Sequence, residues 1–306
     1  MDDDNQKDDT AKGDDVFDCI VIGGGPGGLQ AVVYLGRYNR KALLIDRGGG
    51  RTAHAKSIEN LLTHASIPGR KIIELGMAQA RSFNVRIDRS TVTAVRKQQR
   101  FTVTTREAAY HAEYVIVATG IADILPPIEN LHQFFSTSYF TCVDCDGYKT
   151  RGKKLAVMGD AFESVRIAFA MRRLYTDQVV LVLVSYEPPA GYAEELREEG
   201  IGLYQGTPAR ITGAGRMEAI ELVDGTRVPC EMIMANFGFT RNDGFLKDLD
   251  LKRAANGSII VNHVYESSLS GLFVVGPLNT GNDQVAIAMG QGAAAAIDIN
   301  KRLFDF

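Results

Sequence analysis

The chain has 306 residues, of which 45% are apolar, and this length and composition are typical of a globular protein with two domains. Its formal net charge is only −3. Such a charge gives no positive field that would attract nucleic acid or an acidic membrane surface. We therefore expect a small molecule or another protein as the partner, not nucleic acid and not a membrane.

The start of the chain is acidic and polar. Residues 1–15 contain almost no apolar side chains, so they cannot bury enough surface to offset the entropy of ordering. We predict a disordered acidic tail over residues 1–15. It lacks the basic start and apolar stretch of a secretory signal, and no later run looks long and apolar enough to cross a bilayer, so we expect a cytoplasmic protein.

The segment after the tail predicts a strand, a glycine turn and a helix. A β-branched run at residues 16–22 precedes GGGPGG, and apolar residues from Leu29 onwards recur at near-helical spacing. A second apolar run, residues 42–45, ends at Asp46. This order indicates a βαβ unit with an acidic residue at the tip of its second strand.

The same order of elements returns from residue 154, with a strand at 155–158, a helix at 163–174 and a strand at 179–184. A last strand and a Gly/Ala-rich helix then return to complete the first domain. We predict an α/β protein of two Rossmann-like, three-layer domains, the second inserted into the first. The first domain is expected to span residues 16–123 and 243–306, and the central domain residues 124–242.

The first glycine turn predicts a nucleotide site. Gly23, Gly25 and Gly28 match G-x-G-x-x-G, in which the glycines allow the tight turn, the approach of a pyrophosphate and close helix packing. The spacing alone is a weak signal, but here it follows a predicted strand and opens a predicted helix. The helix N-terminus would bind the phosphates and Asp46 the ribose hydroxyls. A glycine turn without a nucleotide is the alternative.

The matching turn of the second unit, VMGDAFES, keeps Gly159 but has Ala161 and Ser164 where the other two glycines would stand. Asp160 lies between them, and a carboxylate would repel a pyrophosphate. Residues 185–189, after the next strand, contain no arginine that could pair with a 2′-phosphate. We predict a domain with the shape of a nicotinamide site that does not use NADPH; weak binding through backbone groups is the alternative.

Cys142 and Cys145 have the C-x-x-C spacing that can close a disulfide and can hold one thiol as the reactive thiolate. Asp146 follows directly and could pass a proton. A zinc site would need about four ligands, and the sequence has neither a second C-x-x-C nor a histidine cluster, so no metal is expected. An inert cysteine pair is the remaining alternative.

Four motifs in this order resemble the low-molecular-weight thioredoxin reductases: GGGPGG, ATG at 118–120, CVDCDG at 142–147 and GLFVVG at 271–276. The resemblance covers nearly the whole chain after the tail. It implies one FAD per chain, a homodimer, and a thioredoxin-like protein or a small disulfide or dithiol as partner. By the same resemblance Cys145 would face the flavin, Cys142 would attack the partner, and Asp146 would be the acid and base.

The resemblance also implies which residues would bind FAD. They are Gly23, Gly25, Pro26, Gly28, Asp46, Arg47, Arg51, Asn60, Thr119, Gly120, Gly276, Asn279, Gln284 and Val285. The chain departs from the family at Pro277, where the family has an aspartate that contacts the ribityl chain of the flavin. Asn279 is the candidate to replace it.

The VMGDAFES turn is a second departure from the family. It makes the chain most similar to the NADPH-independent branch, which includes the diflavin-linked disulfide oxidoreductases and the ferredoxin-linked flavin thioredoxin reductases. In that case a second flavin or a protein donor such as ferredoxin would take the role of the nicotinamide.

We therefore predict an FAD-dependent disulfide oxidoreductase that moves two electrons between the flavin, the Cys142/Cys145 pair and an external disulfide or dithiol, without NADPH. Three alternatives stay open. They are a dithiol oxidase that uses oxygen on a small molecule, an NADPH-dependent thioredoxin reductase, and a flavin-binding redox sensor without turnover. The sequence leaves open the electron donor, the substrate and the direction of flux.

Overall fold

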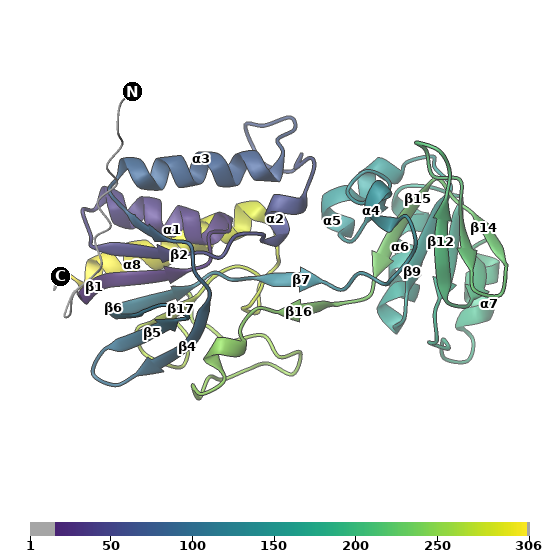
Figure 1. Ribbon diagram of the computed structural model, residues 1–306. Helices are drawn as coiled ribbons and strands as arrows, with labels where there is room; N and C mark the ends of the chain where they lie inside the picture. Colours follow the sequence, from purple (N-terminus) through teal and green to yellow (C-terminus); the bar gives the residue numbers. More distant parts are fainter. Residues whose placement is uncertain (1–15, 305–306) are drawn as a thin grey trace, which may run out of the picture. The chain divides into compact units, whose positions relative to one another are not determined.

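The computed structural model describes residues 16–304 (Figure 1). The predicted tail, residues 1–15, lies outside the described residues, as do residues 305–306. The chain forms two compact units. Of the described residues, unit 1 combines 16–52, Lys71–Ile121 and 241–304, and unit 2 combines Ala53–Arg70 and Ala122–Thr240.

Unit 1 is built on a seven-stranded sheet. Its strands in spatial order are β3 (Arg86–Asp88), β2 (Ala42–Ile45), β1 (Val16–Ile22), β6 (Ala109–Val117), β5 (Phe101–Thr105) and β4 (Val92–Lys97), and β17 (Leu272–Val274) also pairs with β6. The pairings among β3, β2, β1, β6 and β17 are parallel, whereas β6–β5 and β5–β4 are antiparallel. The carboxyl ends of the parallel strands therefore meet at one edge of the sheet.

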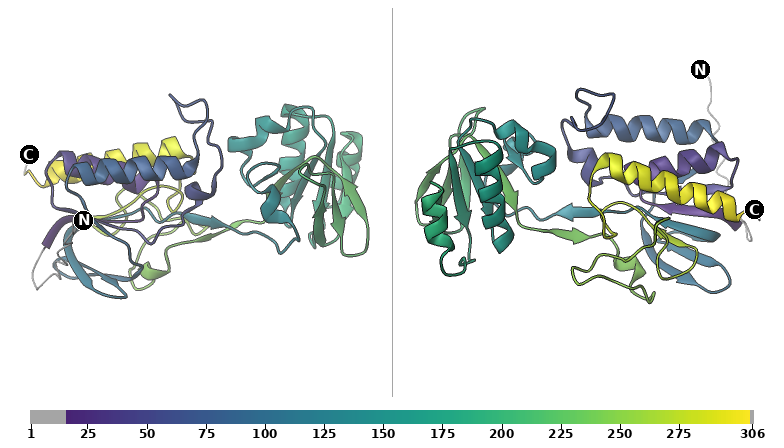
Figure 2. Two further views of the ribbon diagram at one scale, coloured as in Figure 1. Left: turned by 45° about the horizontal axis from the view of Figure 1, so that its top comes forward. Right: turned by 180° about the vertical axis from the view of Figure 1, so that it is seen from behind.

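Three helices cover one face of this sheet: α1 (Pro26–Arg37), α3 (Gly69–Ser82) and α8 (Val285–Arg302) (Figures 1 and 2). Successive residues of a strand point to opposite faces. Cys19 and Val21 of β1 accordingly pack into the core beneath the helices, while Ile20 and Ile22 pack into a second core on the other face. Both faces of the parallel strands are thus buried, as their continuous apolar sequence requires.

Unit 2 has a five-stranded parallel sheet in the order β11 (Gly202–Gln205), β10 (Val179–Leu183), β9 (Leu155–Gly159), β15 (Met232–Asn236) and β8 (Tyr139–Phe140). Helices α6 (Phe162–Leu174) and α7 (Tyr192–Glu198) contribute to the core on one face, which also contains Leu155 and Val157. The core on the other face contains Ala156 and Met158 and side chains of a three-stranded antiparallel sheet, β12 (Pro208–Thr212), β13 (Ala219–Leu222) and β14 (Arg227–Pro229). These layers confirm the predicted α/β class with Rossmann-like sheets.

Short elements complete the chain. β7 (Ile121–Asp123) and β16 (Phe239–Arg241) pair with each other at the two points where the chain passes between the units, close to the domain boundaries expected after residues 123 and 242. The others are α2 (Arg51–His54), α4 (Leu131–Phe134), α5 (Val143–Asp146), η1 (Gly147–Thr150) and η2 (Gly244–Leu246). Within residues 16–304, no helix combines the length and the apolar character needed to cross a membrane.

One segment differs from the expected domain boundaries. Residues 16–123 were assigned to the first domain, but Ala53–Arg70 belongs to unit 2. The backbone N–H of Lys56 donates to the Ser136 hydroxyl at 3.0 Å, and Glu59 approaches the Lys149 ammonium at 3.5 Å. The segment has little periodic apolar sequence, so only these long-range polar contacts reveal where it belongs.

The tight packing of α8 on α1 yields a stability prediction. A Cβ at Gly292 would lie 2.0 Å from the Gly27 carbonyl oxygen, so the backbones would have to separate to admit alanine. We expect Gly292→Ala to lower stability by about 1–3 kcal/mol, the usual range for overpacking, and to lower the midpoint of thermal unfolding.

Gly290→Ala is the matched control, because a Cβ at Gly290 of the same helix would meet nothing within 4 Å. Alanine is the better helix former, so this variant is expected to be more stable by about 0.5–1 kcal/mol. Equal unfolding midpoints for the two variants would contradict the proposed role of the close helix contact.

Candidate active site

The first glycine turn connects β1 to α1 and contains two glycines that the fold itself requires. Gly23 has φ +104°, and a Cβ there would lie 2.6 Å from the Ala118 carbonyl oxygen. A Cβ at Gly28 would lie only 1.9 Å from the Gly23 carbonyl oxygen. No side chain fits at either position, so these glycines by themselves say nothing about a ligand.

Gly25 is different, because the protein around it does not require a glycine. It has φ −74° and ψ 178°, and the nearest atom to an added Cβ would be the Ala118 oxygen at 3.8 Å. The space beside Gly25 opens on the N-terminus of the 12-residue helix α1, which begins at Pro26 and has no side-chain cap. Uncapped backbone N–H groups and the helix dipole favour an anion there, so the turn fits a pyrophosphate.

Asp46 follows β2 and lies over the same turn. Its Oδ1 accepts a hydrogen bond from the Gly24 N–H at 2.9 Å, and its Oδ2 is 3.0 Å from Nη1 of Arg89. An ionised carboxylate has about four acceptor positions. Two protein contacts therefore leave capacity for donors such as ribose hydroxyls, and the structure fixes the carboxylate in the place where the sequence motif expects it.

The remaining predicted flavin residues of unit 1 lie near the same edge of the sheet. Thr119 and Gly120 follow β6, Gly276 follows β17, and Gln284 and Val285 begin α8. Arg47 and Arg51 follow β2, where Arg47 is 3.5 Å from the Asn242 side-chain oxygen and Arg51 is ion-paired with Asp283 at 2.5 Å. Asn60 is the exception, since it belongs to the segment of unit 2.

Asn279 is buried and its side chain is used within its own loop. Its amide nitrogen donates to the Val274 carbonyl at 3.0 Å and to Gln291 at 2.9 Å, and its amide oxygen accepts from the Gly281 N–H at 2.8 Å. Both amide hydrogens therefore have acceptors. These contacts give Asn279 a structural role in its own loop, and its replacement of the family's aspartate at position 277 stays a prediction, since the amide oxygen has a second lone pair.

Gln291 is a residue that the sequence analysis missed. It is 4% exposed, and its Oε1 accepts from the Gly276 N–H at 2.6 Å as well as from Asn279. It thereby fixes the loop after β17, which carries the predicted flavin residue Gly276. The available sequence signal was a glutamine side chain on the buried side of a predicted Gly/Ala-rich helix.

Cys142 and Cys145 form a disulfide, with Cα atoms 5.3 Å apart, and both residues are half-buried. Cys142 is the N-cap of α5, and its sulfur accepts a hydrogen bond from the Cys145 N–H at 3.1 Å. After reduction the same N–H would stabilise a thiolate on Cys142, because a hydrogen bond to a charged acceptor is stronger than one to a neutral acceptor. The geometry favours Cys142 as the sulfur that attacks an external disulfide.

Asp146 ends α5, and its backbone N–H donates to the Cys142 carbonyl at 3.1 Å. Its carboxylate lies 3.0 Å from the Lys149 ammonium.

The two free cysteines differ from the disulfide pair. Burial raises the pKa of Cys19, and it raises the pKa of Cys230 to about 12, so both are poor nucleophiles. No group of three or more His, Cys, Asp or Glu side chains within residues 16–304 is arranged to hold a metal ion.

The second turn, between β9 and α6, is organised around Asp160. Its Oδ1 accepts from the backbone N–H groups of Ser185 at 2.7 Å and Tyr186 at 2.6 Å, and its Oδ2 accepts from the Ser185 hydroxyl at 2.7 Å. The Ser185 hydroxyl contributes most to holding the pKa of Asp160 below its ordinary value, followed by the Ser185 N–H. Asp160 is therefore a permanent negative charge near neutral pH.

The two turns place their carboxylates in opposite ways. In unit 1 the carboxylate of Asp46 comes from the end of the second strand and binds the N–H of Gly24 in the turn. In unit 2 the carboxylate of Asp160 stands in the turn, at the position matching Gly24, and binds N–H groups after the second strand. The residues of the turn itself therefore include a carboxylate in unit 2 but not in unit 1.

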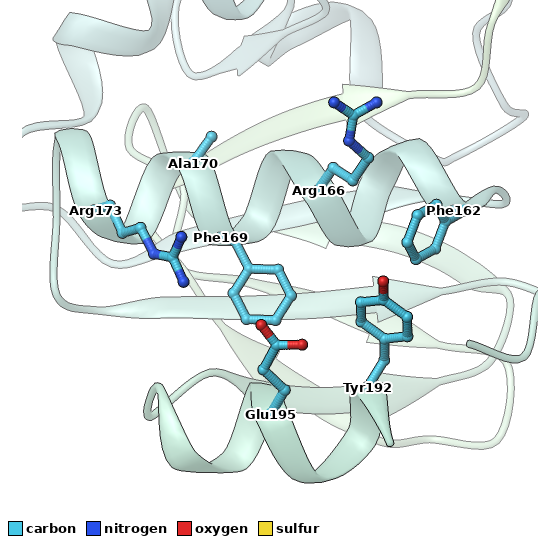
Figure 3. A pocket seen from close by; sticks show the side chains of 7 residues that line it. All are labelled: Phe162, Arg166, Phe169, Ala170, Arg173, Tyr192 and Glu195. Atoms are coloured by element: carbon cyan, nitrogen blue, oxygen red, sulfur yellow. The ribbon is translucent and has the colours of Figure 1, made fainter. Parts of the chain in front are cut away.

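A shallow groove of about 350 Å³ lies between α6 and α7. Figure 3 shows Phe162 and Phe169 pointing from α6 toward Tyr192 and Glu195 of α7. Of the two arginines that line it, Arg166 is ion-paired with Glu163 at 3.2 Å and Arg173 with Glu199 at 2.6 Å. Both guanidinium groups are therefore paired with carboxylates at the surface of unit 2.

Known proteins share this architecture over most of the chain. The family model described as pyridine nucleotide-disulphide oxidoreductase matches residues 17–292. The thioredoxin reductase of Treponema pallidum (strain Nichols) is 28% identical, over 92% of this chain and 95% of its own length. The crystal structure of HlmI has a TM-score of 0.88 and 28% identity, covering 94% of this chain and 93% of that one.

A further solved structure, the putative thioredoxin reductase TrxB from Bacillus anthracis, has a TM-score of 0.86 and 25% identity over 94% of this chain and 99% of its own. The family match includes the glycine turn, the disulfide and the last strand. The chain therefore belongs to the pyridine nucleotide-disulphide oxidoreductase family, and it is a flavin disulfide oxidoreductase of the thioredoxin reductase-like type.

Proposed function

We propose that the protein is an FAD-dependent disulfide oxidoreductase that works without NADPH. Two electrons would pass between the flavin, the Cys142/Cys145 pair and an external disulfide or dithiol. The observation that carries the NADPH-independent part is the Asp160 carboxylate, which already occupies the N–H groups after β10 and adds a negative charge to the turn.

FAD fits unit 1 through the space at Gly25, the uncapped start of α1 and the Asp46 carboxylate. When bound, the flavin would supply a carrier that takes up and releases two electrons. Of the residues expected from the sequence, those near the strand edge would hold it: Gly23, Gly25, Pro26, Gly28, Asp46, Arg47, Arg51, Thr119, Gly120, Gly276, Gln284 and Val285. Asn60 is proposed as a contact from unit 2.

The cysteine pair would reduce a partner in two steps. The Cys142 thiolate attacks one sulfur of the partner's disulfide, which forms a mixed disulfide and releases the other sulfur as a thiolate. The Cys145 sulfur then attacks Cys142, its proton passes to Asp146, and the second partner thiolate leaves. The first partner thiolate takes from solvent the proton that Cys142 gave up on ionising, the second takes the Cys145 proton from Asp146, and two electrons have moved from the pair to the partner.

NADPH would meet two obstacles in unit 2. Its pyrophosphate would approach the negative charge of Asp160, whose depressed pKa keeps it ionised. The N–H groups of Ser185 and Tyr186 lie after β10, where a ribose or its phosphate would bind in a Rossmann unit, and Asp160 already accepts from them. Binding would have to replace these charge-assisted hydrogen bonds.

An NADPH-dependent thioredoxin reductase is the second candidate. It is favoured by the names of the similar proteins and by the parallel sheet of unit 2, in which α6 begins at Phe162 without a side-chain cap. The two candidates share the flavin and the disulfide. They differ in whether unit 2 delivers the electrons.

The partners follow from the same resemblance. We propose a thioredoxin-like protein or a small disulfide or dithiol as the exchanging partner, and a second flavin or a protein such as ferredoxin as the donor. A homodimer is proposed on the same ground.

The first test is an anaerobic titration of the purified protein with dithiothreitol, NADPH and NADH, recorded by flavin absorbance. Dithiothreitol should bleach the flavin through the cysteine pair, and neither nicotinamide should do so. Rapid bleaching by NADPH would establish the second candidate instead. A spectrum without flavin in protein refolded or purified with FAD would overturn both.

The role of Asp160 has its own test. Asp160→Gly combined with Ala161→Gly removes the charge and supplies the second glycine of the motif, so NADPH binding should strengthen at least about tenfold, which corresponds to about 1.4 kcal/mol. Tryptophan is absent from the chain, so binding is followed by calorimetry. Glu218→Gln, which removes an exposed charge beside β13, is the control and should have no such effect.

Replacing Cys145 is expected to separate flavin binding from electron transfer. Cys145→Ser should leave the flavin content unchanged and slow bleaching by dithiothreitol at least about a hundredfold, since the sulfur expected to face the flavin is lost as a nucleophile. Cys230→Ala, which alters a buried thiol, is the control and should bleach at the original rate. Equal rates in Cys145→Ser and the unmodified protein would exclude the proposed route.

A further inference from the structure

Lys149 occupies an unusual place beside the disulfide. It lies in η1, directly after α5, and its ammonium is 3.0 Å from Oδ1 of Asp146 and 3.5 Å from Oε1 of Glu59. The ammonium also lies 5.6 Å from the ring centre of Phe140 and 5.8 Å from that of Tyr148. One cation thus bridges two carboxylates and lies near two aromatic rings.

The bridge is partly shielded from water. The side chain of Lys149 is 21% exposed, that of Asp146 21% and that of Glu59 28%. Partly buried charges are screened less than surface charges. Removing any one of the three charges should therefore change the pKa of the other two groups, whereas removing a fully exposed ion pair has little effect on its neighbours.

Glu59 comes from a separate segment that is itself held in place. The backbones of Ile58 and Ile67 exchange two hydrogen bonds, of 2.8 and 3.0 Å. The Ser57 hydroxyl donates to Oε1 of Glu59, the oxygen that also approaches Lys149. The Glu59 carboxylate is therefore held in position beside Lys149 by its own segment.

We propose that Lys149 is a positioning residue for Asp146, and that Glu59 is the second carboxylate that keeps Lys149 paired while Asp146 carries a proton. The inference rests on the proposed function, in which Asp146 accepts the proton of Cys145. It extends the site to a lysine and a glutamate that neither the C-x-x-C motif nor the family match assigns.

The proton transfer explains why two carboxylates are useful. When the Cys145 sulfur bonds to Cys142, the bond from Cys142 to the partner sulfur breaks and its electron pair leaves on the partner thiolate. The proton of Cys145 moves to Asp146, which becomes neutral, and then to the partner thiolate. While Asp146 is neutral, Lys149 would lose its closest counter-charge, and Glu59 supplies a replacement without a rearrangement of the backbone.

Other charged groups lie on the elements around Asp146. Asp144 is on α5, Arg151 follows η1, and Asp123 on β7 accepts from the Thr141 hydroxyl at 3.2 Å. The variants described below leave these groups unchanged, so their effect on the pKa of Asp146 is the same in every variant. Lys149 is at ion-pair distance from Asp146, and its removal is therefore the sharpest perturbation available.

Two variants should move the pH dependence in opposite directions. Lys149→Met removes the cation, so Asp146 keeps its proton to higher pH and becomes a base only there. Glu59→Gln removes the competing carboxylate, so Lys149 pairs with Asp146 alone and Asp146 ionises at lower pH. The rate of disulfide closure should fall at acid pH, where Asp146 is protonated, and this fall is the acid limb of the pH profile. A neighbouring charge commonly shifts a carboxyl pKa by about one unit, so the acid limb should move by about one pH unit upward in the first variant and downward in the second.

The measurement is a stopped-flow reaction of the dithiothreitol-reduced, desalted holoprotein with dithiobis(nitrobenzoate) over a range of pH. The first released thiolate reports attack by Cys142, and the second reports closure of the disulfide by Cys145, the step that needs Asp146. The acid limb of the second release is compared between variants. Lys149→Arg restores a cation and should keep the original limb.

Lys71→Met is the matched control, because Lys71 forms an i,i+3 ion pair with Glu74 at 2.8 Å on the exposed surface of α3. Circular dichroism and thermal unfolding identify variants that fail to fold, and Lys149→Arg and Glu59→Gln keep the test decisive if Lys149→Met is one of them. Limbs that stay in place, or that move in the same direction, would overturn the inference. Absence of any thiolate release from the unmodified protein would refute the proposed function itself.

Discussion

The contact of Gly28 with the carbonyl oxygen of Gly23 determines how unit 1 is assembled. Because a Cβ at Gly28 would come within 1.9 Å of that oxygen, only glycine lets α1 start this close to the end of β1. The helix N-terminus is thereby directed at the edge where the parallel strands end, and α8 packs on the same helix through Gly292. The start of α1, Asp46 and the loops after β6 and β17 all take their positions from this arrangement.

Unit 2 repeats the architecture but not the electrostatics. Its helix α6 also follows a parallel strand, yet the carboxylate stands on the turn and binds N–H groups after β10. The two turns thus differ in which element supplies the carboxylate: the end of β2 in unit 1 and the turn itself in unit 2. The shared fold therefore does not settle which of the two units handles a nucleotide.

The local features were predictable from the sequence because they depend on neighbours in the chain. The strand at 16–22, the glycine turn and the C-x-x-C pair all carry short patterns with a physical basis. The bridge from Lys149 to Glu59 spans 90 positions, and no periodicity links them. Asn279 was expected at the flavin because of its place near Pro277, but only the structure reveals that Gln291 and Val274 accept both of its amide hydrogens.

Gly25 is a position where folding and ligand binding make different demands. Alanine would fit its φ and ψ and the space around it, and replacing glycine at such a position commonly gains about 0.4–1 kcal/mol by restricting the unfolded chain. In a lineage that no longer bound a nucleotide, nothing in the fold would resist drift to alanine. The matching position of unit 2 is already Ala161, in an extended conformation open to any side chain. Of the two turns, only that of unit 1 therefore keeps a glycine at a position where its own backbone does not require one.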